Sequence, residues 1–236
     1  MVVALDGFKI AYFPVHKAAC TSTKAALYKL EKSKLSPDQS QLMGETPPPK
    51  YNATKFRSRD FKKLEKYWCF AIVRDPLEKI LSAYQDKIVV RNDLAGLEDN
   101  FRTKIANRLV GLTRYDTATY RNLPTQPDLE TFILNIQYYN AKFPHIYHHT
   151  RPTQYYLGNH LSRFDRIYRM DELTNMQSEI SIRVGQNFTL PKHNSTRSVE
   201  TSSANSLSKK AFEHAMRYLW KDYQFLKEYY PMPKRD

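Results

Sequence analysis

The stretch "WCFAIVRDPLEKILSAY", residues 68–84, constrains the fold most, because one structural pattern changes directly into another. Its first six residues are all apolar, which predicts a strand over residues 68–73 that is buried on both faces. Asp75 and Pro76 then predict a helix start, since Asp is a preferred N-cap and Pro suits the first helical position. The apolar residues that follow recur at helical spacing and form one stripe: Leu77, Ile80, Leu81, Tyr84 and Ile88.

The same order of patterns recurs along the chain. Residues 8–15, "FKIAYFPV", predict a second buried strand, and residues 22–34 predict the helix after it. Further predictions are helices over residues 101–112, 129–143 and 207–230 and a short strand over 166–170. Alternating strands and helices indicate an α/β fold with a parallel sheet covered on both faces. The 236 residues suffice for one well-buried domain, so we expect a single domain over residues 1–236.

The net charge of +13 points to polyanionic partners, although the basic residues are spread along the chain and also suit an ordinary solvated surface. Cys20 and Cys69 lack the spacing of a disulfide framework or a metal site, so no metal is expected. No window approaches about 18 apolar residues, so no transmembrane helix is predicted. The start "MVVALDGFK" meets Asp6 too early for a secretory leader.

The loop "HKAACTST", residues 16–23, joins the strand predicted over residues 8–15 to its helix, which is where unpaired amides and the helix dipole attract anions. Lys17 and Lys24 flank a group of small residues: Cys20, Thr21, Ser22 and Thr23. A Walker loop would need two glycines that this loop lacks, which disfavours ordinary ATP binding. A plain turn capped by Ser or Thr is the alternative interpretation.

Arg74 follows the strand predicted over residues 68–73 at its carboxyl end, where open α/β sheets bind ligands. Ser82 falls opposite the apolar stripe and on the side of the helix start, so both residues can contact one phosphate. A guanidinium suits bidentate phosphate contact. Taken singly, Arg74 could instead pair with Asp75 or Glu78, and Ser82 could be a solvated helix position.

These segments resemble the PAPS-dependent sulfotransferases, particularly the carbohydrate branch (sulfotransferase family 2); PAPS is 3′-phosphoadenosine 5′-phosphosulfate. "HKAACTSTK" (16–24) is similar to the motif PK-x-A-C-T-x-x-K. "RDPLEKILSAYQDK" (74–87) is similar to R-[DH]-P-x-x-R-x-x-S-A-Y-x-D-K, with Lys79 for the usual Arg. "HTRP" (149–152) resembles H-W-x-P without its Trp. "FDRIYRMDEL" and "KDYQFLKEYY" resemble the late strand and final helix, so the resemblance spans almost the whole chain.

The resemblance implies a P-loop NTPase-like, three-layer α/β fold with a short central parallel sheet flanked by helices. It implies that Arg74 and Ser82 hold the 3′-phosphate. The 5′-phosphosulfate would be surrounded by Lys17, Ala19, Cys20, Thr21, Ser22 and Thr23. The late loop over residues 191–198 offers Arg197 to the 3′-phosphate, with Lys192 and Ser195 beside it, unless it is an ordinary basic loop.

Sulfuryl transfer should resemble phosphoryl transfer, in which positioning and charge stabilisation do most of the work. Lys17 is placed to neutralise the oxygen that bridges sulfur and phosphorus. The acceptor hydroxyl needs a base, and histidine suits neutral pH. In the cluster "HIYHHTRP" we favour His149, with Glu78 and His16 as alternatives. The histidines of the cluster could also be without chemistry, and a metal site there lacks matching carboxylates.

The sequence therefore predicts a sulfotransferase that moves a sulfuryl group from PAPS, leaving PAP, to a hydroxyl of a carbohydrate acceptor. One alternative is a P-loop-type kinase, for which only Asp75 could hold Mg²⁺. The other is a non-enzymatic basic module for nucleic acid or acidic glycan, which no motif supports. We expect no nucleic-acid partner. We expect a cytoplasmic location if the chain is complete, and the Golgi lumen if it derives from a membrane-anchored protein.

Overall fold

The computed structural model describes residues 2–36, 38, 44, 46–48, 51–94, 117–191 and 204–234. The chain divides into two compact units, one of Met1–Arg74 with Thr153–Ser195 and one of Asp75–Pro152 with Thr196–Asp236. The single domain expected over residues 1–236 stays a prediction. The helix predicted over 101–112 and the late-loop residues Lys192, Ser195 and Arg197 lie outside the described residues.

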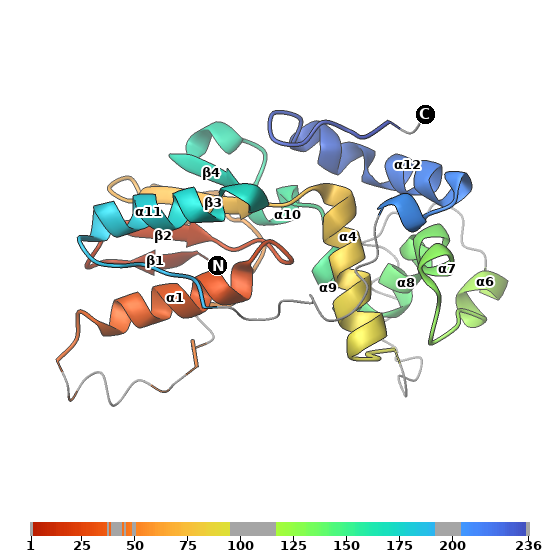
Figure 1. The fold of residues 1–236 in the computed structure, drawn as a ribbon, viewed down its shortest axis with the longest axis horizontal. Coiled ribbons are helices and arrows are strands. Elements are labelled where there is room, and N and C mark those ends of the chain that lie inside the picture. Colours follow the sequence, from red (N-terminus) through yellow and green to blue (C-terminus); the bar gives the residue numbers. More distant parts are fainter. Residues whose placement is uncertain are drawn as a thin grey trace. The chain divides into compact units, whose positions relative to one another are not determined.

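A four-stranded sheet forms the centre of the first unit, in the order β1-β2-β3-β4 (Figure 1). Its strands are β1 (Val3–Leu5), β2 (Ile10–Phe13), β3 (Trp68–Val73) and β4 (Arg166–Arg169). β2, β3 and β4 are parallel, whereas β1 pairs antiparallel with β2. The sheet confirms the predicted α/β class, and β3 matches its prediction residue for residue. β1 was not predicted, because three residues carry too little alternation to be read as a strand.

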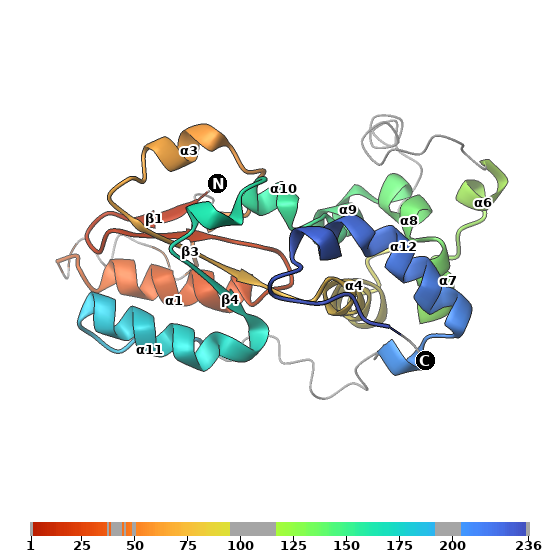
Figure 2. The same ribbon diagram turned by 90° about the horizontal axis from the view of Figure 1, so that it is seen from above.

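Two helices, α1 (Cys20–Lys32) and α11 (Leu173–Val184), lie side by side on one face of this sheet (Figure 2). Next to their carboxyl ends, Gln186 Nε2 donates to Ser33 Oγ at 2.8 Å. The Tyr168 hydroxyl of β4 donates to Glu179 of α11 at 2.6 Å. The first contact joins the two helices to each other, and the second joins α11 to the sheet.

Aromatic side chains cover the opposite face, together with α3 (Ser58–Lys62) and α10 (Gln154–Leu157). Phe13 stacks on Phe61 at 4.9 Å between ring centroids and meets Phe164 edge-on at 4.9 Å. Its neighbour Tyr12 points the other way, toward Thr23 of α1, as strand geometry requires. All four residues of β2 are buried, which confirms that the sheet is covered on both faces.

The second unit is helical: α4 (Pro76–Tyr84), the π-helix η2 (Gln85–Val90), α6 (Thr117–Arg121), α7 (Leu129–Leu134), α8 (Ile136–Lys142), α9 (Pro144–Thr150) and α12 (Lys209–Phe225). The predicted stripe of α4 is buried in one core with residues of α7, α8, α9 and α12. The helix predicted over 129–143 is broken at Asn135. α12 starts later than predicted, because Ser208 Oγ accepts the Ala211 N–H at 3.2 Å and caps it. Short 3₁₀ turns complete the elements: Leu161–Arg163, Met170–Glu172 and Ala204–Ser206.

None of the helices within the described ranges is both long and apolar enough to cross a membrane.

His145 of α9 is half-buried next to Lys87 and Asp93, whose Nζ and Oδ2 atoms lie 3.2 Å apart. Burial lowers the pKa of His145 below its usual range, and the Lys87 charge lowers it further. The charge of Asp93 and a hydrogen bond with its backbone oppose this shift. The folded protein therefore favours neutral His145.

We expect His145→Gln to make stability less dependent on pH. A lowered folded-state pKa contributes stability that is fully present above the unfolded value of about 6.5 and is lost as pH falls through the folded value. Urea denaturation of wild type and variant between about pH 7.5 and pH 5 measures this difference. His160→Gln, at an exposed position, is the control. An unchanged pH dependence in His145→Gln would contradict the assignment.

Candidate functional site

The loop between β2 and α1 adopts a backbone conformation that glycine usually provides. Lys17 has φ 63° and Ala19 has φ 51°, both in the left-handed region, on either side of the buried Ala18. For residues with a side chain this conformation costs about 1–2 kcal/mol each. A loop without glycine therefore makes a tight, strained turn here, and such strain is typical of ligand-binding segments.

The helix after this loop starts at Cys20, two residues before the predicted start at Ser22. Its N-cap is Ala19, without a side-chain capping bond, so the alternative of a turn capped by Ser or Thr is wrong. Thr23 N–H donates to the Ala19 carbonyl at 3.0 Å. The preceding amides, those of Cys20, Thr21 and Ser22, have no acceptor within the helix, as in any α-helix. Together with the dipole they can bind an anion.

The side chains of the loop differ in what they can offer. Thr21 is exposed and Ser22 is half-buried, so both hydroxyls can reach a ligand. Cys20 is buried and can contribute its backbone amide. The Thr23 hydroxyl donates to the Ala19 carbonyl at 3.0 Å, and the side chain is fully buried. Thr23 therefore stabilises the helix start, and its place among the expected ligands rests on the resemblance alone.

Arg74 connects the two sequence motifs within the first unit. It is half-buried at the carboxyl end of β3, and its Nη1 donates to the Lys17 carbonyl at 3.2 Å. A guanidinium carries five N–H groups, so this contact leaves it able to bind an anion as well. The structure thus brings Lys17 and Arg74, which lie 57 positions apart, to one end of the sheet.

The segment after "HTRP" packs against the same loop. The Tyr156 ring of α10 meets the His16 ring edge-on, with centroids 5.4 Å apart. Gly158 ends α10 with φ 74°, and a Cβ there would lie 2.6 Å from the Phe56 ring. Only glycine lets the backbone pass this close to Phe56.

Ser82 lies half-buried on α4 in the second unit, between the buried Leu81 and Ala83. Asp75 begins this helix as predicted, since its Oδ1 accepts the N–H groups of Leu77 and Glu78 at 2.9 and 3.0 Å. Burial raises the pKa of Asp75, while hydrogen bonds from Glu78 N–H and the Tyr223 hydroxyl oppose the rise. The Asp75 carboxylate thus acts as a helix cap.

His149 lies half-buried on α9, with its ring edge-on to His148 at 5.3 Å. The next residue fixes the end of this helix, because Thr150 Oγ1 donates to Asn140 Oδ1 at 2.6 Å. Of the alternative bases, Glu78 is exposed on α4, and His16 belongs to the loop. In the part of the chain that the structure describes, no group of three His, Cys, Asp or Glu residues is arranged to hold a metal ion.

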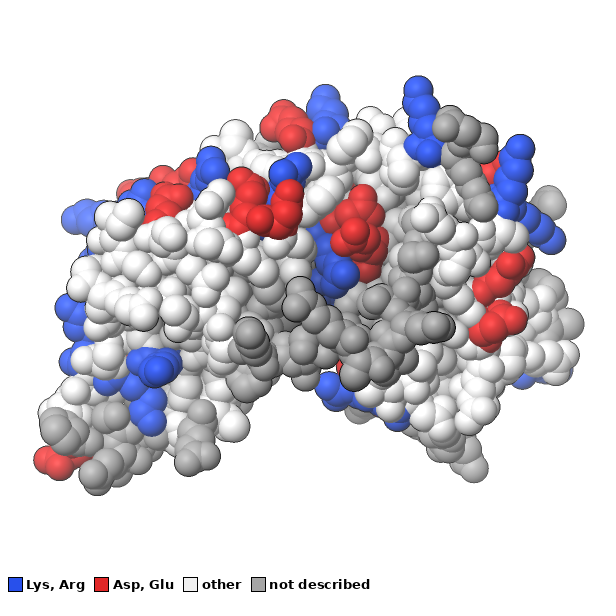
Figure 3. Space-filling model, in the orientation of Figure 1, with Lys and Arg blue, Asp and Glu red and all other residues white. Residues whose placement is uncertain are grey.

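Lys and Arg side chains lie in several separate groups on the face shown in Figure 3, interspersed with acidic ones. The excess positive charge is therefore not collected into one block on this face. Dispersed charge of this kind attracts anions generally and does not mark one binding site.

Comparison with curated proteins and with solved structures gave no match. Comparison with family models gave one described as "Sulfotransferase family", which matches residues 2–232. That match covers the loop, Arg74, α4, α9 and the final helix. The chain belongs to the sulfotransferase family, and the α/β fold and the loop geometry agree with this assignment.

Proposed function

We propose that the protein transfers the sulfuryl group of PAPS to a hydroxyl of a carbohydrate acceptor. Membership of the family supports sulfuryl transfer as the reaction. The observation that supports PAPS as the sulfuryl donor is the hydrogen bond from Arg74 to the Lys17 carbonyl. It places two cationic residues at the strained loop before α1. A donor with two separate phosphate groups suits this arrangement.

The loop and α1 bind the 5′-phosphosulfate in this proposal. The amides of Cys20, Thr21 and Ser22 face the phosphate together with the helix dipole. As the acceptor oxygen attacks sulfur, the bond from sulfur to the bridging oxygen breaks, and its electron pair stays on the phosphate of PAP. Lys17 neutralises the charge that develops there.

Arg74 and Ser82 bind the 3′-phosphate, and the resemblance adds Arg197 to this group. On the acceptor side, His149 takes the proton of the attacking hydroxyl, with Glu78 and His16 as alternative bases. The net charge of +13 favours an acceptor that is itself anionic.

The kinase alternative depended on Asp75 as a magnesium ligand. Its carboxylate instead caps α4 and lies 3.0 Å from the Tyr223 hydroxyl, which favours the sulfotransferase over the kinase.

Binding of the nucleotide tests the donor. We expect PAPS to bind in the presence of EDTA, and Ser82→Ala and Arg74→Ala to weaken PAPS far more than adenosine 5′-phosphosulfate, which lacks the 3′-phosphate. The loss for each variant should be at least tenfold for PAPS, as for a contact to a charged group. Isothermal calorimetry with both ligands measures it. Ser82→Ala is the cleaner variant, because Arg74 also bonds to Lys17. Equal losses for the two ligands, or loss of binding on chelation, would contradict the proposal.

Lys17→Ala should lower kcat about 10²–10³-fold with a smaller change in PAPS affinity, the pattern of a transition-state contact. Alanine keeps a Cβ at this left-handed position, so the substitution removes the amine without relieving the backbone. Steady-state kinetics measures kcat, and calorimetry measures affinity. Lys24→Ala removes a charge from the helix that follows the loop, α1, and should have the smaller effect. Full activity of Lys17→Ala would overturn the mechanism.

His149→Ala should lower turnover strongly while PAPS affinity stays near that of wild type. In wild type the base must be neutral, so kcat/KM should fall as pH drops through a pKa near 6–7. The residual activity of the variant should lack this limb of the pH profile. His148→Ala is the neighbouring control. Wild-type activity in His149→Ala would move the base to Glu78 or His16.

A further inference from the structure

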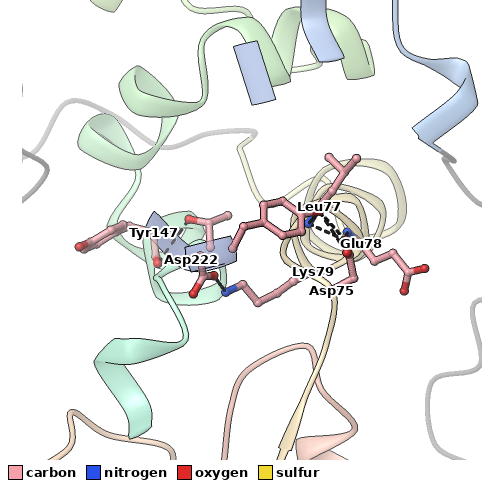
Figure 4. A network of polar contacts seen from close by, with 8 residues as sticks. Asp75, Leu77, Glu78, Lys79, Tyr147 and Asp222 are labelled. Carbon is pink, nitrogen blue, oxygen red and sulfur yellow. Dashed lines mark hydrogen bonds and ion pairs between the residues drawn. The ribbon is translucent and has the colours of Figure 1, made fainter. Parts of the chain in front are cut away.

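Two consecutive residues of α12, Asp222 and Tyr223, contact the first turn of α4 in the second unit. Neither residue has a role in the proposed chemistry. Lys79 Nζ lies 2.5 Å from Asp222 Oδ2, and the two side chains are 1% and 4% exposed (Figure 4). Lys79 belongs to the motif over residues 74–87, and a cation in this motif is a candidate for phosphate binding. Its amine instead forms a buried ion pair with α12.

Tyr223 makes the second contact. Its hydroxyl lies 3.0 and 3.1 Å from the two carboxylate oxygens of Asp75 and accepts the Leu77 N–H at 3.3 Å. Burial first of all, and then the Asp75 charge, raise the pKa of Tyr223, so the hydroxyl keeps its proton and donates a hydrogen bond to Asp75. The cap of α4 is thus itself held by α12.

These two contacts together fix how α4 is rotated. Asp75 and Lys79 are four residues apart and therefore share one face of the helix. Contacts one turn apart prevent both rotation about the helix axis and sliding along it. Ser82 is three residues beyond Lys79, about 4.5 Å along the axis, and moves with the helix. Arg74 directly precedes Asp75 in the chain.

We propose that Asp222 and Tyr223 are positioning residues for the 3′-phosphate of the nucleotide. They hold α4, through Lys79 and Asp75, in the rotation that presents Ser82 to that phosphate. The inference rests on the proposed function and assigns Lys79 to placing the helix instead of binding the ligand.

General stabilisation of the second unit explains these contacts less well. A buried ion pair is weak evidence for stability, because well-packed apolar residues of similar size often serve as well or better. Its best-attested use is to fix one register between helices. The pair here lies at the end of α4 that adjoins Arg74, where register matters to the site.

Tyr223→Phe tests the proposal, because it removes one hydroxyl and keeps the buried ring. Calorimetry measures the ratio of dissociation constants for adenosine 5′-phosphosulfate and PAPS, which isolates the 3′-phosphate. We expect this ratio to fall roughly fivefold or more, the effect of one displaced hydrogen bond. A second variant, Lys79→Gln with Asp222→Asn, removes both charges together and should lower the ratio likewise.

Tyr218→Phe is the matched control. Its hydroxyl, also on α12, accepts a hydrogen bond from Asn140 Nδ2 of α8 at 2.7 Å and not from α4. This variant should lose thermal stability and keep the wild-type ratio. A wild-type ratio in Tyr223→Phe and in the double variant would overturn the positioning role. Absence of any preference for PAPS in wild type would instead overturn the proposed function.

Discussion

The parallel pairing of β2 and β3 is the constraint on which the first unit depends. Tyr12 pairs with Phe70 and Phe13 with Ala71, so both strands end at the same edge of the sheet. The loop before α1 and the Arg74 side chain therefore leave the sheet together, and the guanidinium reaches the Lys17 carbonyl. His16, in the same loop, packs edge-on against Tyr156 of α10.

The loop between β2 and α1 makes a tight turn at a helix start without glycine. Lys17 and Ala19 both adopt left-handed backbone, at a cost of about 1–2 kcal/mol each. The surrounding structure holds them there: Ala18 is buried, and Arg74 and Thr23 bond to the carbonyls of Lys17 and Ala19. The strain thus falls on residues that the proposed chemistry uses, among them Lys17.

The second unit organises polar groups around α4 in a different way. Its apolar stripe supplies the core, and the buried contacts of Asp75 and Lys79 with α12 set the rotation of the helix. Burying a charge costs free energy unless its partner lies in the correct position, whereas apolar side chains tolerate several arrangements. These contacts therefore favour one arrangement of the helices over others. Hydrophobic packing holds the helices together, while the polar contacts define their register.

The sequence by itself determined the local elements. The six-residue apolar run predicted β3, Asp-Pro predicted the start of α4, and helical spacing predicted its buried stripe, because these patterns follow from backbone geometry and N-cap chemistry alone. Two motifs also identified the family. Only the tertiary structure decided which cations have buried partners. Nothing local shows that Lys79 pairs with Asp222, 143 positions away, or that α1 begins at Cys20 after a left-handed Ala19. Those features depend on contacts between distant segments, which no short-range pattern encodes.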